Sequence, residues 1–262
     1  MSKSIFYSDY SWPELKEFVS LDTIIILPVG STEQHGPGLP ICTDDYMAVK
    51  WAEDSTNLAK SKQSMEILVM PGIHYGFAQH HMAFPGTITL SFETLKQIVL
   101  EVGDSVLTHG FKKLVILNVH GGNRNSVRAA ATDLAMKYAR RDPPVRIRVV
   151  EDCDGDINPL VLDRESLLPF TKEAARNGMV HSGALETAKM LYLRPELCDI
   201  GKVKDVNLQP DRSGAEIYPY DVLTPYGALG KPSDATAEAG KIMWDALVLH
   251  FADMLLKMAG TR

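Results

Sequence analysis

The sequence predicts an α/β fold, a single domain over residues 1–262 in which a mostly parallel central sheet is flanked by helices. Short apolar runs rich in β-branched residues alternate along the chain with longer segments whose apolar residues recur at helical spacing. This alternation favours parallel strands joined by crossover helices. There is no break in composition, no internal repeat and no low-complexity stretch to mark a domain boundary.

The expected strands are continuous apolar runs rather than alternating ones, which is typical of strands buried on both faces of a sheet. The first of them ends at Gly30, where the chain can turn sharply. The four runs are Thr23–Val29, Ile67–Met70, Leu114–Val119 and Val145–Val150.

The expected helices begin with one that follows Ser11, because Ser11 and Glu14 can form a capping box and Pro13 is tolerated in a first turn. Later helices are indicated by apolar residues three or four positions apart. They cover Phe92–Val106, Val127–Tyr138, Leu185–Leu191 and a segment after Ser233 that includes Met243, Leu247, Phe251 and Met254. Two polar or Pro/Gly-rich segments, Pro169–Gly178 and Asp205–Lys231, are expected to be long loops.

Composition excludes several classes of protein. The net charge is −6, the isoelectric point is about 5.8 and basic residues do not cluster, so a nucleic-acid partner is not expected. Three irregularly spaced cysteines (Cys42, Cys153 and Cys198) argue against a disulfide framework and fit a reducing compartment. Without a signal-peptide pattern in Met1–Tyr10 or an apolar run long enough for a bilayer, we expect a cytoplasmic protein with no membrane partner.

The first cluster of reactive side chains directly follows the first expected strand. Glu33 and His35 are two residues apart, so they point to the same side of an extended chain, and Asp44 follows shortly after. Ligands of parallel α/β sheets bind at the carboxyl ends of strands. A carboxylate and an imidazole that converge there suit a divalent cation. The alternative is a polar loop with an Asp that caps a helix.

The second cluster, Asn118–Asn123, ends another expected strand and begins a helix. It places His120 at a second strand end. Gly121 and Gly122 allow the backbone to come close to a ligand, and the helix N-terminus favours an anion. The alternative is a tight turn between strand and helix with Asn123 as the cap.

The third cluster is His181–Thr187. If a helix begins at Gly183, Glu186 lies in its first turn. Glu186 then either supports the cap beside a loop histidine, or it is a metal ligand while His181 is a proton donor. Five candidate ligands suffice for two divalent ions that share a carboxylate, with zinc or manganese expected and iron also suitable. They are Glu33, His35, Asp44, His120 and Glu186.

Four segments carry a resemblance to a known family. They read LPVGSTEQHGPGLPICTDD, FPGTITLS, NVHGGN and HSGALETA, and in combination they resemble the creatininase (creatinine amidohydrolase) family over most of the chain. The resemblance implies an α/β fold, two divalent metals, and ring-opening or amide hydrolysis of a small polar molecule. It also implies a homo-oligomer, commonly a hexamer.

The resemblance also implies roles for individual residues. Glu33 and His120 would hold one metal and His35 the other, with Asp44 as the bridge, because Asp44 rather than Asp45 keeps the family's spacing from the EQH motif. A metal-bridging hydroxide would attack a carbonyl carbon, and His181 would protonate the leaving atom as general acid. Glu186 would either complete the second metal's ligands or shuttle the proton, and the sequence leaves both roles open.

Two positions depart from creatininase itself. That enzyme has a glutamate two residues after the histidine that matches His120, where this chain has Gly122, and Glu186 is the expected substitute. Creatininase also has a tryptophan four residues before the match of His181, where this chain has Asn177. We therefore expect His81, Asn123 and Asn177 to bind a small polar cyclic carbonyl substrate other than creatinine.

Other reactions fit the same motifs. One is C–C bond hydrolysis that opens an oxidised inositol ring, as for a compound like 3-dehydro-scyllo-inosose. Others are formamide deformylation and a peptidase role in the maturation of a peptide cofactor. A non-catalytic metal-binding scaffold is the alternative outside enzymes, and the presence of all five candidate ligands argues against it.

Overall fold

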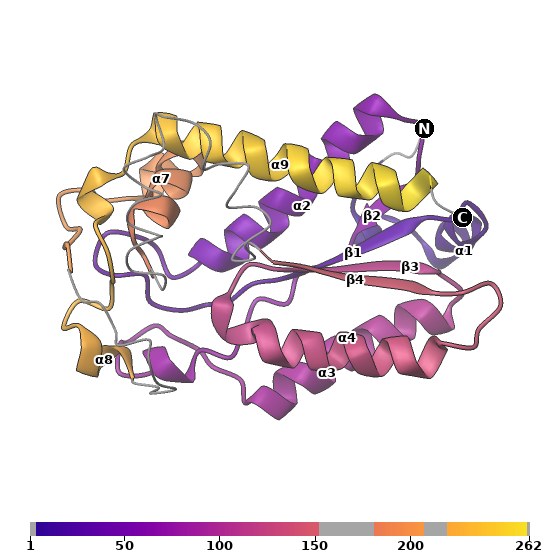
Figure 1. The fold of residues 1–262 in the computed structure, drawn as a ribbon, viewed down its shortest axis with the longest axis horizontal. Helices are drawn as coiled ribbons and strands as arrows, with labels where there is room; N and C mark the ends of the chain where they lie inside the picture. Colours follow the sequence, from indigo (N-terminus) through magenta and orange to yellow (C-terminus); the bar gives the residue numbers. More distant parts are fainter. Residues whose placement is uncertain (1–3, 152–180, 207–218, 261–262) are drawn as a thin grey trace.

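Four parallel strands form the centre of the computed structural model, which describes residues 4–151, 181–206 and 219–260. Their spatial order is β2-β1-β3-β4, so the two strands that precede the first two reactive clusters are neighbours in the middle of the sheet. The parallel sheet flanked by helices confirms the predicted fold class (Figure 1). The strands are β1 (Ile24–Val29), β2 (Ile67–Val69), β3 (Lys113–Asn118) and β4 (Arg146–Glu151).

Helices cover both faces of this sheet, with α2 and α9 on one face and α3 and α4 on the other (Figure 1). The alternation of side chains along β1 divides the core, because Ile24 and Ile26 pack under α2 and α9 while Ile25 and Leu27 face α3 and α4. The α-helices are α1 (Trp12–Ser20), α2 (Thr43–Lys62), α3 (Phe92–Thr108), α4 (Arg124–Tyr138), α7 (Ala184–Leu193), α8 (Tyr220–Leu223) and α9 (Ala237–Gly260). Single 3₁₀ turns occupy Tyr7–Asp9, Gln79–His81, Gly121–Asn123, Pro195–Leu197 and Pro232–Asp234.

Most sequence predictions of secondary structure are confirmed. Each strand ends within one residue of its predicted bounds, and the capping box at Ser11 is present, with Ser11 N donating to Glu14 Oε2 over 2.7 Å. The expectation that every strand is buried on both faces is wrong for β4, which is partly exposed because it lies at the sheet edge. The predicted loop Pro169–Gly178 lies outside the described residues, and the described part of Asp205–Lys231 contains α8.

Helix α2 was not predicted, although it is 20 residues long. Its buried face does repeat at helical spacing, but most of its members are small or polar, such as Ala48, Ser55 and Thr56. Small and polar residues contribute little to a hydrophobic pattern, so the helical period of α2 cannot be recognised in the sequence. The consequence for the site is direct, because Asp44 lies in the first turn of this helix. No helix among the described residues is long and apolar enough to cross a membrane.

Helices α7 and α9 lie side by side at one end of the molecule (Figure 1), and their contact depends on Gly240. A Cβ atom at Gly240 would lie 1.8 Å from the carbonyl oxygen of Ala188, so only glycine allows the two backbones to approach this closely. Ala184, Ala188, Ala239 and Met243 fill the rest of the contact. This packing fixes the helix that carries Glu186.

Gly240→Ala should therefore destabilise the protein, even though alanine is the better helix former by about 1 kcal/mol. Overpacking of this kind costs about 1–3 kcal/mol, and here the clash is with backbone that cannot rotate away. The midpoint of urea unfolding measures the effect. Gly260→Ala is the matched control in the same helix, because a Cβ there meets nothing within 4 Å. Equal midpoints for the two variants would contradict this account of the α7–α9 contact.

Candidate metal centre

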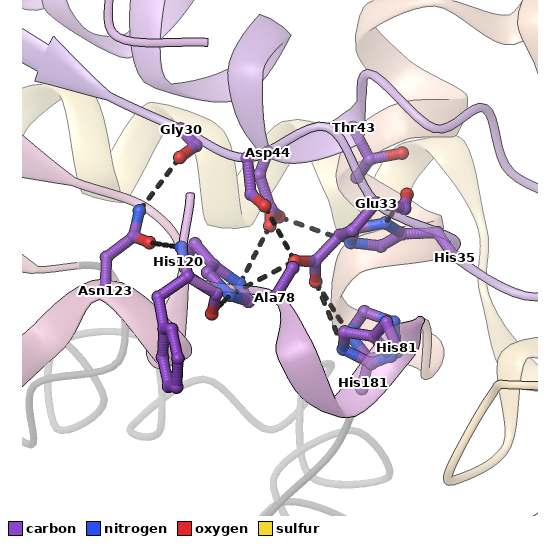
Figure 2. A network of polar contacts seen from close by, with 12 residues as sticks. Gly30, Glu33, His35, Thr43, Asp44, Ala78, His81, His120, Asn123 and His181 are labelled. Carbon is purple, nitrogen blue, oxygen red and sulfur yellow. Dashed lines mark hydrogen bonds and ion pairs between the residues drawn. The ribbon is translucent and has the colours of Figure 1, made fainter. Parts of the chain in front are cut away.

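The five candidate ligands converge beyond the carboxyl ends of β1 and β3. Glu33 and His35 follow β1, and His120 follows β3. Asp44 comes from the first turn of α2 and Glu186 from the first turn of α7. Four of the five are shown together in Figure 2, where Asp44 lies between His120 and His35. Neighbouring parallel strands end at one edge of the sheet, so the loops that leave them meet there.

Asp44 contacts a different histidine through each of its carboxylate oxygens. Oδ1 lies 3.2 Å from His35 Nε2, and Oδ2 lies 3.2 Å from His120 Nδ1 (Figure 2). The side chain is almost fully buried, so neither oxygen is satisfied by bulk water. This arrangement, with one imidazole nitrogen beside each oxygen, suits a carboxylate shared by two cations.

Glu33 is also divided between two sets of neighbours. Its Oε2 lies 3.1 Å from His120 Nε2 and accepts a 2.8 Å hydrogen bond from the hydroxyl of Ser31. Its Oε1 faces the opposite way, 3.3 Å from His81 Nε2 and 3.7 Å from His181 Nδ1 (Figure 2). Glu33 therefore links the His120 side of the centre to the two other histidines.

Glu186 completes the group from α7. Its Oε2 lies 3.7 Å from His35 Nε2 and accepts a 2.6 Å hydrogen bond from the backbone N–H of Ser182. Ser182 has a φ of 53°, in the left-handed region that a serine adopts at a cost. The strained residue thus turns the chain between His181 and α7 so that both side chains reach the centre.

One ring nitrogen of His35 and one of His120 contact backbone carbonyls, and the one of His120 is the nitrogen that also lies beside Glu33. His35 Nδ1 donates to Glu33 O over 3.1 Å, and His120 Nε2 donates to Phe77 O over the same distance. A histidine that binds a metal almost always donates its other N–H in this way, which fixes the tautomer. The other ring nitrogens, His35 Nε2 and His120 Nδ1, face Asp44, and a bound cation would displace the protons that they carry.

Buried atoms without hydrogen-bond partners test whether a cation fits. Glu33 Oε1, His35 Nε2 and His81 Nε2 are buried and form no hydrogen bond. Three sets of ligand atoms each lie within 4.8 Å of one another, as the ligands of one ion do. The sets are Glu33, His35 and Asp44; His35, His181 and Glu186; and Glu33, His81 and His181. These nitrogen and oxygen donors fit zinc or manganese.

The electrostatics of the centre show how strongly it favours positive charge. Burial lowers the pKa of His35, but the carboxylates of Asp44, Glu186 and Glu33 together outweigh burial and raise the pKa to about 10. Burial likewise opposes the charge on His120, and Glu33 and Asp44 raise its pKa well above the usual value. Burial raises the pKa of Glu33, but His120, His81 and His181 together hold it well below its usual value. Two buried carboxylates therefore need cationic partners, which divalent ions supply.

The neighbouring aspartate has a different partner. Asp45 Oδ1 lies 2.7 Å from Nδ1 of His74, whose side chain is more than half exposed. Of the two aspartates in the motif, only Asp44 faces the candidate ligands, as the resemblance implied. The roles of the individual ligands remain predictions.

The residues predicted to bind substrate differ in their placement. His81 is buried beside Glu33, and Asn177 lies outside the described residues. Asn123 is buried with both ends of its amide engaged by backbone, since Oδ1 accepts from Phe77 N and Nδ2 donates to Gly30 O, each over 2.8 Å. These bonds hold the Phe77 carbonyl against His120, so the contacts of Asn123 support the metal centre. Its predicted contact with substrate stays a prediction.

The backbone explains why Gly122 carries no ligand. A Cβ atom there would lie 2.3 Å from Phe77 O and 2.4 Å from His120 Nε2. A glutamate could not occupy this position unless the backbone moved. The carbonyl that fixes the tautomer of His120 thus occupies the space that a side chain at position 122 would need.

Two further residues at the site were missed by the sequence analysis. The buried ring of Tyr220, on α8, has its centroid 4.2 Å from that of His81 and 5.1 Å from that of His181. Gln34 lies between the same two histidines. A tyrosine in a long loop and a glutamine between two expected ligands give no signal of their own. The three tryptophans lie in α1, α2 and α9, and the phenol ring that packs against His81 and His181 is that of Tyr220.

A family model described as creatinine amidohydrolase matches residues 8–255. The chain belongs to the creatininase family. It is 29% identical to the creatinine amidohydrolase of Pseudomonas putida, over 97% of both chains. It is 27% identical to a mycofactocin precursor peptide peptidase of Mycolicibacterium smegmatis, over 92% of this chain and 87% of the relative. A 3-dehydro-scyllo-inosose hydrolase of Thermotoga maritima is 29% identical over 45% of this chain and 36% of its own.

Solved creatininases share the fold. A creatinine amidohydrolase structure aligns over 100% of both chains with a TM-score of 0.80 and 26% identity. A creatininase described as a Mn form aligns over 99% of this chain and 100% of its own, with a TM-score of 0.80 and 25% identity. Family membership establishes this chain as a hydrolase of the creatininase type and leaves its substrate open.

The predicted metal-binding role of Asp44 can be tested by comparing substitutions of Asp44 and Asp45. Asp44→Asn should remove most bound metal, because an amide cannot serve as a shared anionic bridge. Asp45→Asn removes only a half-exposed contact with His74 and should leave the metal content unchanged. Metal content is measured by elemental analysis after loading with Zn²⁺ or Mn²⁺ and gel filtration. Loss of metal from Asp45→Asn, with Asp44→Asn still loaded, would reverse the assignment.

Proposed function

We propose that this chain is a dinuclear metal hydrolase that cleaves an amide or a ring C–N bond in a small, polar, cyclic carbonyl compound. The observation that carries the proposal is Asp44, whose two oxygens each face a histidine that is held in the tautomer of a metal ligand. Two ions that share this carboxylate would fit the arrangement. The manganese form of a related solved creatininase supports the choice of metal.

Each position has its own set of donors. Glu33, His120 and Asp44 would hold one ion. His35, Asp44 and Glu186 would hold the other. When bound, the two ions supply Lewis-acid activation of water and of the substrate carbonyl.

His181 is the residue that we propose to move the proton. Burial and the charge of His35 hold its pKa well below the usual value, so the ring is neutral. Its Nδ1 lies 3.7 Å from Glu33 Oε1 and belongs to the set of donors with His35 and Glu186. A neutral ring first accepts a proton from the attacking water and then returns it to the leaving nitrogen as general acid.

The substrate is proposed to differ from creatinine. Asn177 occupies the position of the creatininase tryptophan, and no tryptophan among the described residues lies at the site. A peptide substrate is the second candidate, because the matched mycofactocin peptidases cover most of this chain. The match to the inosose hydrolase covers less than half of the chain and gives C–C cleavage weaker support. The homohexamer and the cytoplasmic location remain predictions.

A substrate panel tests the proposed function. Metal-loaded protein is incubated with cyclic amides, N-formyl compounds, short peptides and diketo-inositols, and the products are identified by mass spectrometry. We expect a hydrolysed cyclic amide, with loss of turnover after chelation and recovery on addition of Zn²⁺ or Mn²⁺. Peptide fragments would favour the second candidate. A fully metal-loaded protein that turns over none of these classes would contradict the proposal.

The role of Glu186 has its own test. Because its Oε2 faces His35 Nε2, we expect Glu186→Gln to lose one of two bound ions and to lower kcat by at least about tenfold, as weakened metal ligands do. Elemental analysis and turnover are measured together. Glu196→Gln is the control, since that carboxylate is exposed and paired with Arg194. Two retained ions with lost activity would instead identify Glu186 as the proton shuttle.

A further inference from the structure

Gln34 lies in the centre of the site and contacts two histidines that face Glu33. Its amide nitrogen is 2.8 Å from His81 Nδ1, 3.1 Å from His181 Nε2 and 2.9 Å from the carbonyl oxygen of Gly227. Its amide oxygen accepts a 2.9 Å hydrogen bond from Gly36 N. The side chain is 5% exposed, so these protein groups decide its orientation.

Two backbone groups fix which end of the amide is which. The N–H of Gly36 can only donate and the carbonyl of Gly227 can only accept, so a flipped amide would lose both hydrogen bonds. Gly227 is adapted to this contact: it has a φ of +75°, and a Cβ atom there would lie 1.9 Å from Gln34 Oε1. Gln34 is therefore held with its nitrogen towards the histidines.

The hydrogens of this nitrogen can then be assigned. His181 Nε2 lies 2.7 Å from the backbone carbonyl of Gln34, which only accepts, so His181 Nε2 carries a hydrogen and cannot accept one from the Gln34 side chain. The two amide hydrogens go to Gly227 O and to His81 Nδ1. His81 Nδ1 is thus an acceptor, and in the neutral ring the hydrogen of His81 is on Nε2.

His81 differs from the other three histidines of the site in the direction of its hydrogen bonds. His35, His120 and His181 each donate one N–H to a backbone carbonyl, and the other nitrogen of each ring faces a carboxylate of the centre. His81 accepts at its far nitrogen and presents Nε2–H instead. This nitrogen is buried without a hydrogen-bond partner, 3.3 Å from Glu33 Oε1. A metal on Nε2 would require this hydrogen to move to Nδ1, where the Gln34 N–H opposes it, or to leave the ring.

We propose that Gln34 is a positioning residue that makes His81 a neutral hydrogen-bond donor at the centre, ready to bind an oxygen of the substrate, while His181 is kept as the proton acceptor. The proposal rests on the proposed function for its catalytic meaning, but the tautomers themselves do not depend on it. It also assigns the set of Glu33, His81 and His181 to hydrogen bonding rather than to a third ion.

The tautomers are measured by ¹⁵N NMR of protein labelled at histidine, without metal or substrate, with signals assigned through His81→Asn and His181→Asn. In the wild type we expect both His81 and His181 to be protonated at Nε2. Gln34→Glu places an acceptor beside His81 Nδ1 and should move the His81 proton to that nitrogen. Gln34→Met removes the donor and should leave His81 in a mixture of both tautomers.

The control is Gln97→Met, because Gln97 is an exposed residue of α3 that bonds only to Glu101 among the described contacts, and it should change neither tautomer. Near-ultraviolet circular dichroism shows which variants fold, and either Gln34 variant alone suffices. A wild-type His81 protonated at Nδ1, or a folded Gln34 variant with an unchanged His81 tautomer, would overturn the proposal. Because the spectra need no turnover, an inactive protein would count against the proposed function and leave this result standing.

Discussion

The buried carboxylate of Asp44 sets the conditions that the rest of the site satisfies. Charge on a carboxylate is expensive away from water unless cations or strong donors surround it. Here His35 and His120 lie 3.2 Å from its two oxygens, Glu33 lies at the other nitrogen of His120, and Glu186 lies 3.7 Å from the same nitrogen of His35. The segment after β1 contributes Glu33 and His35, while the segment after β3, helix α2 and helix α7 contribute one residue each, so moving any of them leaves a buried charge unpaired.

Much of this arrangement could be predicted from the sequence, because it follows from strand ends. Glu33 and His120 come directly after apolar runs whose type and length indicate buried parallel strands, and such strands bring their following loops together. The choice of Asp44 over Asp45 needed the resemblance to a family, since adjacent aspartates are equivalent in pattern. The structure separates them by direction: one faces the histidines of the centre and the other faces His74.

Other features could not be predicted, because they depend on contacts between distant segments. Helix α2 hides its period behind small buried residues, and Tyr220 reaches the site from a loop far along the chain. Gln34 lies within the EQH motif, and the motif indicates no separate role for it. Its role follows only from its hydrogen bonds with Gly36 and Gly227, which fix the orientation of the amide. Hydrogen-bond direction is a property of the folded chain, and no spacing of residues encodes it.

The carbonyl of Phe77, which excludes a side chain at Gly122, has a consequence for the whole molecule. A carboxylate ligand that position 122 cannot supply must come from another element, and Glu186 on α7 lies 3.7 Å from His35 Nε2. With Glu186 as a ligand, as proposed, a cation shared with Asp44 would act as a reversible cross-link between the sheet edge and the α7–α9 pair. Its binding free energy then becomes folding free energy, about 2.7 kcal/mol at a free metal concentration a hundred times the Kd. Metal supply would thus govern the lifetime of the folded protein in addition to its chemistry.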